Sequence, residues 1–110
     1  MVAPGRVVLV RFLSDLSHAK LRPAVVLSAV GRGDYILRPA TSAAYSDARA
    51  VPLTDQDFVE GGLRLRSFVR PGKLFTANEQ LITREVGVLT DVKREEVVRA
   101  LTALINENRA

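Results

Sequence analysis

Hydrophobic and polar positions along the chain predict a series of short β-strands. Residues 6–12 and 22–28 each contain a run of four aliphatic side chains, which is typical of buried strands. The polar segment between these two runs is long for a hairpin loop. Gly31 and Gly33 then mark a turn into a third strand, residues 34–40, whose side chains alternate between two faces.

The middle of the chain predicts two more strands with a short helical turn between them. The segments ARAVPL and LRLRSFV are the strand candidates, and alternation of leucine with arginine in the second predicts one wet face. The segment TDQDFVEGG predicts a turn of helix that begins at Thr54 and ends at Gly61 and Gly62.

The clearest amphipathic pattern predicts a helix over residues 91–106. Thr90 is placed to cap its N-terminus, and Glu95 and Arg99 have the spacing of an i,i+4 ion pair. Its apolar face consists of Val97, Val98, Leu101, Leu104 and Ile105. Short strands followed by one helix predict a mainly β protein with a C-terminal α-helix. We expect a small, strongly bent antiparallel barrel that this helix closes at one edge.

Length, charge and composition narrow the classes of function. A chain of 110 residues has room for one core, so we expect a single domain over residues 1–110. It carries 16 Lys and Arg against 12 Asp and Glu, a net charge of +4, which favours a nucleic acid or an acidic protein segment as partner. Aliphatic runs of only four residues predict no membrane span and no secretory signal, and therefore a cytoplasmic location.

Cysteine and histidine usage limits the chemistry. The chain has no cysteine and one histidine, without a paired-histidine spacing, which argues against disulfides, thiolate metal sites and a zinc centre. We therefore expect an activity that needs no metal and no cofactor.

The segment AKLRPAVVLS, residues 19–28, places a cation at the mouth of an apolar strand. Pro23 keeps the backbone before it extended, so the Arg22 side chain starts from a rigid base. A guanidinium held in this way suits the oxygens of a phosphate. The alternative is that Arg22 is a solvated residue at the start of a strand.

A second group of cations lies within ten residues: Arg64, Arg66, Arg70 and Lys73. Alternate spacing puts Arg64 and Arg66 on one side of the predicted strand, where they can contact an RNA backbone or an acidic protein segment. The alternative is an ordinary solvated face.

Four blocks of the sequence together resemble one family. They are VVLVRFLSDLSHAKLRPAVVLS, PATSA, PLTDQDFVEGGLRLRSFVRPGKLFT and LITREVGVLTDVKREEVVRALTALI. In order and spacing they resemble the PemK/MazF family of bacterial toxin–antitoxin systems. The resemblance implies an SH3-like barrel, a homodimer, and a sequence-specific, metal-independent endoribonuclease that an antitoxin neutralises.

The resemblance also implies roles for individual residues. Arg22 matches the family's catalytic arginine, and Thr41 matches its second catalytic position, with Ser42 adjacent. Cleavage of RNA without metal uses the 2′-hydroxyl as nucleophile. It needs a base, positive charge on the phosphoryl oxygens and a proton for the leaving 5′-oxygen. The expected products are a 2′,3′-cyclic phosphate and a 5′-hydroxyl. The alternative for Thr41 is a turn in which its hydroxyl bonds the local backbone.

Further residues are expected to contact the substrate. Asp15, Ser17 and His18 share the loop that covers the site in the family, and His18 is the only side chain with an ordinary pKa near neutrality. Each of the three is otherwise an ordinary loop residue. The residues expected to bind RNA are Lys20, Arg64, Arg66, Arg70 and Lys73.

The sequence departs from the family pattern in two places. Gly72 stands where many relatives carry an acidic residue that in some serves as the base, so the resemblance leaves the general base unassigned. Gly5 and Arg6 replace an early Gly-Asp, a change we expect to affect a structural contact.

Two other classes of function compete with the ribonuclease. The first is a CcdB-like toxin that shares the barrel and poisons DNA gyrase by binding. The absence of tryptophan argues against it, because the gyrase-binding proteins carry one in a terminal tail. The second is a catalytically decayed relative that only binds, for which Gly72 is the support. The expected partners are single-stranded RNA, an antitoxin with an acidic, disordered C-terminal segment, and a second copy of the chain.

Overall fold

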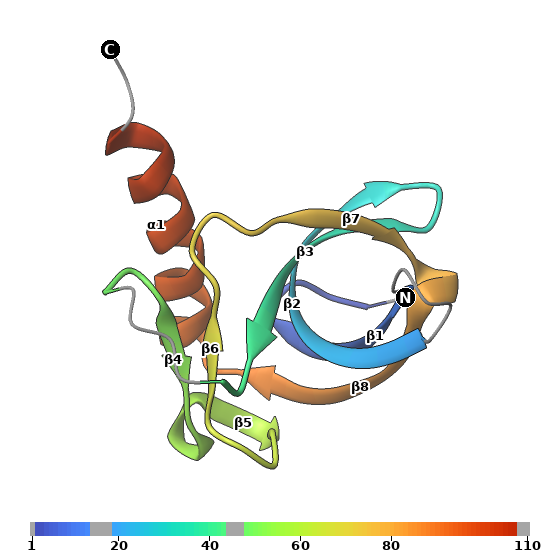
Figure 1. Cartoon of the computed structure of the whole chain (residues 1–110), viewed down its shortest axis with the longest axis horizontal. Helices are drawn as coiled ribbons and strands as arrows, with labels where there is room; N and C mark the ends of the chain where they lie inside the picture. Colours follow the sequence, from blue (N-terminus) through green and yellow to red (C-terminus); the bar gives the residue numbers. More distant parts are fainter. Residues whose placement is uncertain (1, 14–18, 44–47, 108–110) are drawn as a thin grey trace.

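The chain folds into an antiparallel sheet that curls on itself, with a single helix packed at one side (Figure 1). This computed structural model describes residues 2–13, 19–43 and 48–107. The elements are β1 (Arg6–Leu13), β2 (Ala19–Gly31), β3 (Asp34–Thr41), β4 (Val51–Leu53), η1 (Asp55–Asp57), β5 (Phe58–Gly61), β6 (Ser67–Val69), β7 (Phe75–Asn78), η2 (Glu79–Leu81), β8 (Ile82–Leu89) and α1 (Asp91–Glu107).

The strand order explains the curled shape. The sheet runs β4-β6-β3-β2-β1-β8-β5, and β7 also pairs with β3. In Figure 1, strands β1, β2, β3, β7 and β8 surround a common centre like a small barrel. The β2–β3 hairpin closes through Arg32 and Gly33, whose φ angles of 57° and 78° belong to the mirror-image turn that suits strand twist. The mainly β fold with a C-terminal helix is therefore confirmed.

Two hydrophobic cores lie on opposite faces of the sheet. One lies inside the curled sheet and contains Val8, Val10, Ala24, Val26, Tyr35, Leu37 and Ala77. The other lies toward the helix and contains Val7, Val25, Ala40, Val51, Leu53, Val69, Leu89 and Val97. Because successive side chains of a strand point to opposite faces, β1 and β2 supply both cores. Both faces of these two strands are therefore buried, and this explains why their aliphatic runs are continuous rather than alternating with polar residues.

Helix α1 confirms the prediction for the end of the chain. The Lys93 amide donates to the Thr90 hydroxyl over 3.1 Å, which is the expected N-terminal cap. Val97 is fully buried, whereas Val98 and Ile105 are 40% and 59% exposed, so only part of the predicted apolar face packs on the sheet. None of the described helices is long and apolar enough to cross a bilayer.

The predictions for the middle of the chain need correction. Residues 63–66 form a loop, and the strand expected there begins only at Ser67. The helical turn after Thr54 is a 3₁₀ helix that ends at Phe58, so Gly61 does not stop it and instead completes β5. At Gly61 the backbone of β5 approaches β8 so closely that an added Cβ would lie 2.1 Å from the Val86 carbonyl oxygen.

Candidate functional site

Arg22 lies at the N-terminal end of β2, on the face that lines the inside of the curled sheet. It is exposed and pairs with Val10 of β1, whose side chain belongs to the inner core. Residues two apart on a strand share a face, so Arg22 continues the row of Ala24 and Val26 out of the core into solvent. Lys20 is exposed and extends the same row by a further two residues.

The pairing of β2 with β3 relates Arg22 to Thr41. The ladder ends at the pair of Ala24 and Pro39. Arg22 and Thr41 each lie two residues beyond that pair, so both share its face of the sheet. Thr41 is half-buried at the last position of β3, where it pairs with Phe68 of β6. The two side chains expected to act on a phosphate therefore lie just beyond the β2–β3 ladder, on one face of the sheet.

The Thr41 hydroxyl takes part in a local turn. The Ala43 amide donates to the Thr41 Oγ1 atom over 3.2 Å, which is the structural use of threonine that competes with the catalytic interpretation. In this bond the Thr41 oxygen is the acceptor, so its hydroxyl hydrogen can still be donated to another group. The turn therefore orients the hydroxyl without using its donor.

The loop before β6 places Arg66 beside Phe68. The Arg66 guanidinium carbon lies 5.3 Å from the centre of the Phe68 ring, a cation–π contact. Phe68 pairs with Thr41 of β3 on one side, and Arg66 also lines a pocket with Thr54 and Asp55, which follow β4. This differs from the predicted alternation, which put Arg66 and Phe68 on opposite faces of a strand.

Arg64 belongs to a pocket on the other face of β2. Leu21 and Pro23 form part of its wall, the loop carrying Arg64 covers it, and Arg84 of β8 also lines it. The pocket has a volume of about 410 Å³ and is lined by Ser42 as well. Arg64 also lines a smaller pocket of about 200 Å³ together with Arg66. Arg84 is a cation that the sequence pattern did not single out.

The segment between β6 and β7 carries Arg70 and Lys73. Arg70 is half-buried, and its amide donates to the Pro39 carbonyl over 3.1 Å, so the segment starts directly beside β3. Lys73 is exposed. Their carbonyl oxygens both accept hydrogen bonds from the side chain of Arg38, at 2.6 Å and 3.4 Å.

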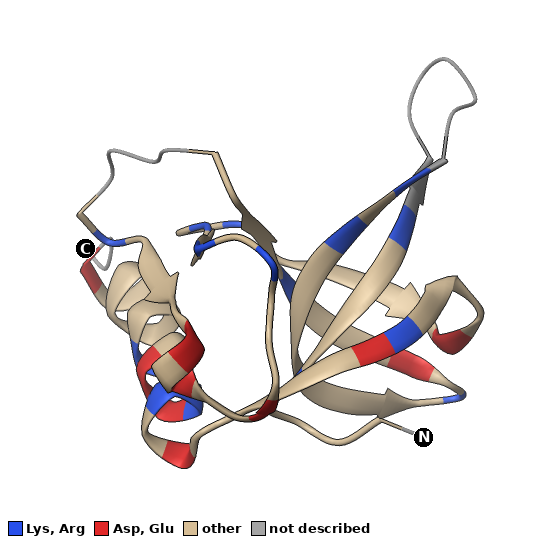
Figure 2. Cartoon of the chain, turned by 90° about the horizontal axis from the view of Figure 1, so that it is seen from below, with Lys and Arg blue, Asp and Glu red and all other residues tan. Residues whose placement is uncertain are grey.

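Charges are unevenly distributed over the molecule. Figure 2 shows basic segments on both strands of the β1–β2 hairpin below its grey tip, and most acidic segments lie in the lower half of that view. Asp15, Ser17 and His18 fall outside the described residues. No group of three His, Cys, Asp or Glu side chains within the described ranges is arranged to hold a metal ion.

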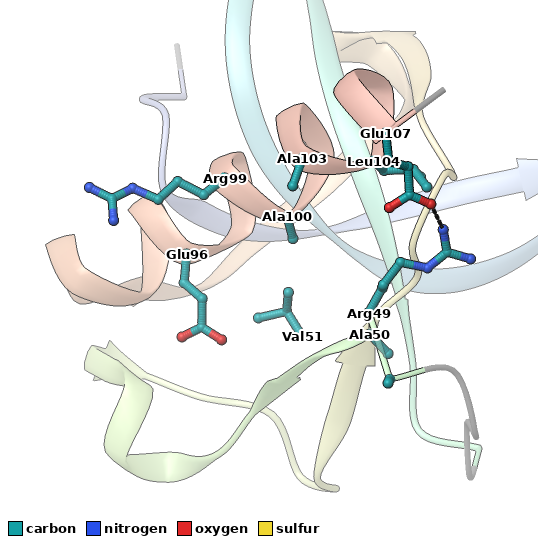
Figure 3. Close-up of a pocket in the computed structure, with 10 residues that line it drawn as sticks. Arg49, Ala50, Val51, Glu96, Arg99, Ala100, Ala103, Leu104 and Glu107 are labelled. Carbon is teal, nitrogen blue, oxygen red and sulfur yellow. Dashed lines mark hydrogen bonds and ion pairs between the residues drawn. The ribbon is translucent and has the colours of Figure 1, made fainter. Parts of the chain in front are cut away.

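A second groove lies between α1 and β4, away from these cations. Its volume is about 340 Å³, and it is lined by small side chains including Ala50, Ala100 and Ala103 (Figure 3). An ion pair between Arg49 and Glu107, with 2.6 Å between its nitrogen and oxygen, closes one end. The residues lining this groove include none of the predicted site residues.

Solved structures of toxins share this architecture. The chain superposes on Mycobacterium tuberculosis toxin MazF-mt6 with a TM-score of 0.72 at 18% identity, covering 92% of this chain and 96% of that one. For MazE-MazF from Deinococcus radiodurans the TM-score is 0.75 at 20% identity, with 94% of each chain covered. An endoribonuclease in complex with its cognate antitoxin from a mycobacterial species gives 0.74 at 16% identity, with both chains covered completely.

The likeness to these structures defines the class of fold, a curled antiparallel sheet with one C-terminal helix. No curated protein sequence is significantly similar to the chain. The model of one protein family matches residues 3–105, however, which is nearly the whole chain. The chain belongs to the PemK-like, MazF-like toxins of type II toxin–antitoxin systems.

Proposed function

We propose that this toxin is a metal-independent endoribonuclease that cleaves single-stranded RNA at a specific sequence. The observation that carries the proposal is the β2–β3 ladder, because Arg22 and Thr41 each lie two residues beyond its last pair, Ala24 and Pro39, on one face of the sheet. An arginine supplies a permanent charge with a planar fork for phosphate oxygens, and a threonine supplies a neutral donor. Family membership gives independent support.

The reaction requires no group outside the chain and the substrate. The 2′-oxygen attacks the adjacent phosphorus and loses its proton to a base, while the bond from phosphorus to the 5′-oxygen breaks and that oxygen gains a proton. Arg22 stabilises the charge that develops on the phosphoryl oxygens, and Thr41 donates to one of them. Gly72 offers no base, so Asp15 and His18 are the proposed candidates for the proton transfers.

The proposed substrate groove continues from Arg22 over the cations of neighbouring segments. Lys20 shares the Arg22 row, and Arg66 lies beside Phe68, the residue that pairs with Thr41. Arg64, Arg70, Lys73 and Ser42 provide contacts outside this row. Cations at successive positions along a strand suit the regular spacing of RNA phosphates.

We further propose a homodimer and an antitoxin partner. Leu65 and Leu74 lie beside the basic segments and are 65% and 49% exposed, so a second copy of the chain would bury them. A net charge of +4 attracts an acidic antitoxin segment to the same groove as RNA. Two of the similar structures described above contain an antitoxin, as MazE-MazF and as a complex with a cognate antitoxin.

The test is cleavage of a long single-stranded RNA by the purified protein in EDTA, followed by mapping of the cut sites and their ends. We expect cuts at one short motif that leave a cyclic phosphate and a 5′-hydroxyl, and no cleavage of DNA of the same sequence. Arg22→Ala is expected to abolish cleavage while the protein stays folded.

Arg99→Ala is the matched control, since Arg99 is exposed and its ion pair with Glu95 lies on the surface of α1. Intact RNA in the presence of folded wild-type protein would reject the ribonuclease. A supercoiling assay with DNA gyrase would then test the binding toxin instead.

A further inference from the structure

Arg38 is a buried cation that donates hydrogen bonds to three backbone carbonyls. It lies in the middle of β3, and only 1% of its surface is exposed. Its guanidinium donates to the carbonyl oxygens of Arg70, Val97 and Lys73, at distances of 2.6, 3.1 and 3.4 Å. Burial lowers the pKa of Arg38 from its ordinary value, because desolvation penalises the charged form.

This geometry uses all three nitrogens of a rigid, planar group. Nε and Nη2 reach the segment between β6 and β7, and Nη1 reaches the middle of α1. A buried donor that loses its acceptor has no water to replace it, so each carbonyl is held in place firmly. Arg38 therefore fixes the path of residues 70–73 relative to β3.

Contacts that do not involve the Arg38 side chain also hold residues 70–73 in place. The Arg70 amide bonds the Pro39 carbonyl, so the Arg70 residue is held through both its amide and its carbonyl. Gly72 has a φ of 72° and lies against α1, where an added Cβ would be 3.3 Å from Leu104. The Arg38 guanidinium also bonds the carbonyl of Lys73, the residue after Gly72.

We propose that Arg38 is a positioning residue for RNA binding, which holds residues 70–73 so that the Arg70 and Lys73 side chains meet the substrate phosphates. Arg38 and Thr41 belong to the same strand, so this link sets the distance between the phosphate contacts and the cleaved bond. The proposal rests on the proposed ribonuclease function.

The first experiment compares steady-state cleavage of RNA by wild type, Arg38→Lys and Arg38→Met at several salt concentrations. Arg99→Met is the control, because the Arg99 side chain is 77% exposed. We expect Arg38→Met to raise KM about tenfold, as the loss of one charge-assisted contact does, with little change in kcat.

The salt dependence of KM gives a second readout. The slope of log KM against log salt is expected to fall by up to about 1.4, because each lost phosphate contact contributes about 0.7 on a single strand. Arg38→Lys, which keeps one donor group and the charge, is expected to restore part of both effects.

A purely structural role gives a different result. If Arg38 only stabilises the fold, fewer molecules of the Arg38→Met variant are folded. The apparent kcat then falls in proportion to the folded fraction, while KM and the salt slope stay unchanged. That outcome overturns the proposal. The folded fraction is measured by circular dichroism on the same samples.

A double-mutant cycle keeps the test decisive if Arg38→Met does not fold. Arg38→Lys is placed in a chain that already carries Arg70→Ala and Lys73→Ala. If Arg38 acts through those two side chains, the substitution no longer changes KM in this background. An unchanged effect of Arg38→Lys in both backgrounds refutes the proposal.

Hydrogen exchange in the absence of RNA separates this inference from the proposed function. Loss of protection at residues 70–74 in Arg38→Lys, with unchanged protection in β1 and β2, supports the positioning role whether or not the wild type cleaves RNA. Unchanged exchange at residues 70–74 contradicts it. Wild-type protein that is folded but inactive rejects the ribonuclease alone.

Discussion

Replacement of Gly61 by alanine should be far more damaging than the same replacement at Gly31. Both glycines have a positive φ, 63° at Gly61 and 92° at Gly31, so each alanine costs about 1–2 kcal/mol for the left-handed backbone. Only Gly61 adds a steric cost, since its Cβ would lie 2.1 Å from the Val86 oxygen and 2.9 Å from the Gly87 Cα atom. At Gly31 no atom lies within 4 Å of the added carbon.

The clash at Gly61 forces β5 away from β8. Overpacking of this kind costs about 1–3 kcal/mol, so the total for Gly61→Ala is about 2–5 kcal/mol against 1–2 kcal/mol for Gly31→Ala. Urea unfolding followed by circular dichroism measures both free energies of unfolding. Equal losses of stability in the two variants would refute the reasoning. Because β5 leads into the loop that carries Arg64 and Arg66, RNA cleavage should also weaken in Gly61→Ala at temperatures where it is folded.

Two further predictions concern the site and the helix. Thr41→Ala should slow cleavage about 10²-fold without changing the products, because this is the usual loss for one donor to a developing oxyanion. Wild-type kinetics in this variant would show that Thr41 serves only the turn that it forms with Ala43. Lys93→Met should lower the free energy of unfolding by about 1–3 kcal/mol, because the ion pairs of the buried ammonium with Asp57 and Glu96, at 3.6 and 2.9 Å, are both lost. An unchanged urea midpoint in Lys93→Met would contradict this account.

Sequence patterns predicted the elements in which local signals agree. The aliphatic runs of β1 and β2, the glycines of the following turn and the Thr90 cap each depend on neighbours in sequence, and the structure confirms those elements. Strand β8 gave no clear pattern, because only its second half is buried on alternate positions. The arginine–leucine alternation at residues 63–66 indicated a strand, but these residues form a loop directly after two glycines with positive φ.

The candidate site was only partly readable from the sequence. Arg22 before Pro23 is a local signal, whereas the role of Thr41 came only from the family resemblance. That both residues share one face depends on the pairing of β2 with β3. Arg38 stands between the apolar residues Leu37 and Pro39 in a predicted strand. A charge among apolar neighbours was the one signal in the sequence that could have pointed to Arg38. Its acceptors are backbone carbonyls 32, 35 and 59 residues away, which no pattern of side chains reveals.

The pairing of β1 with β8 makes the order of synthesis important. Arg6 pairs with Val88, so β1 gains its second neighbour only after the residues of β8 have also been synthesised. Contacts so distant in sequence form late, because the entropy of closing a long loop opposes them. A chain interrupted before residue 82 contains both Arg22 and Thr41 but lacks β8, which closes the sheet beside β1. Synthesis as far as Thr41 is therefore not enough to close the sheet that carries Arg22 and Thr41, because closure also needs β8.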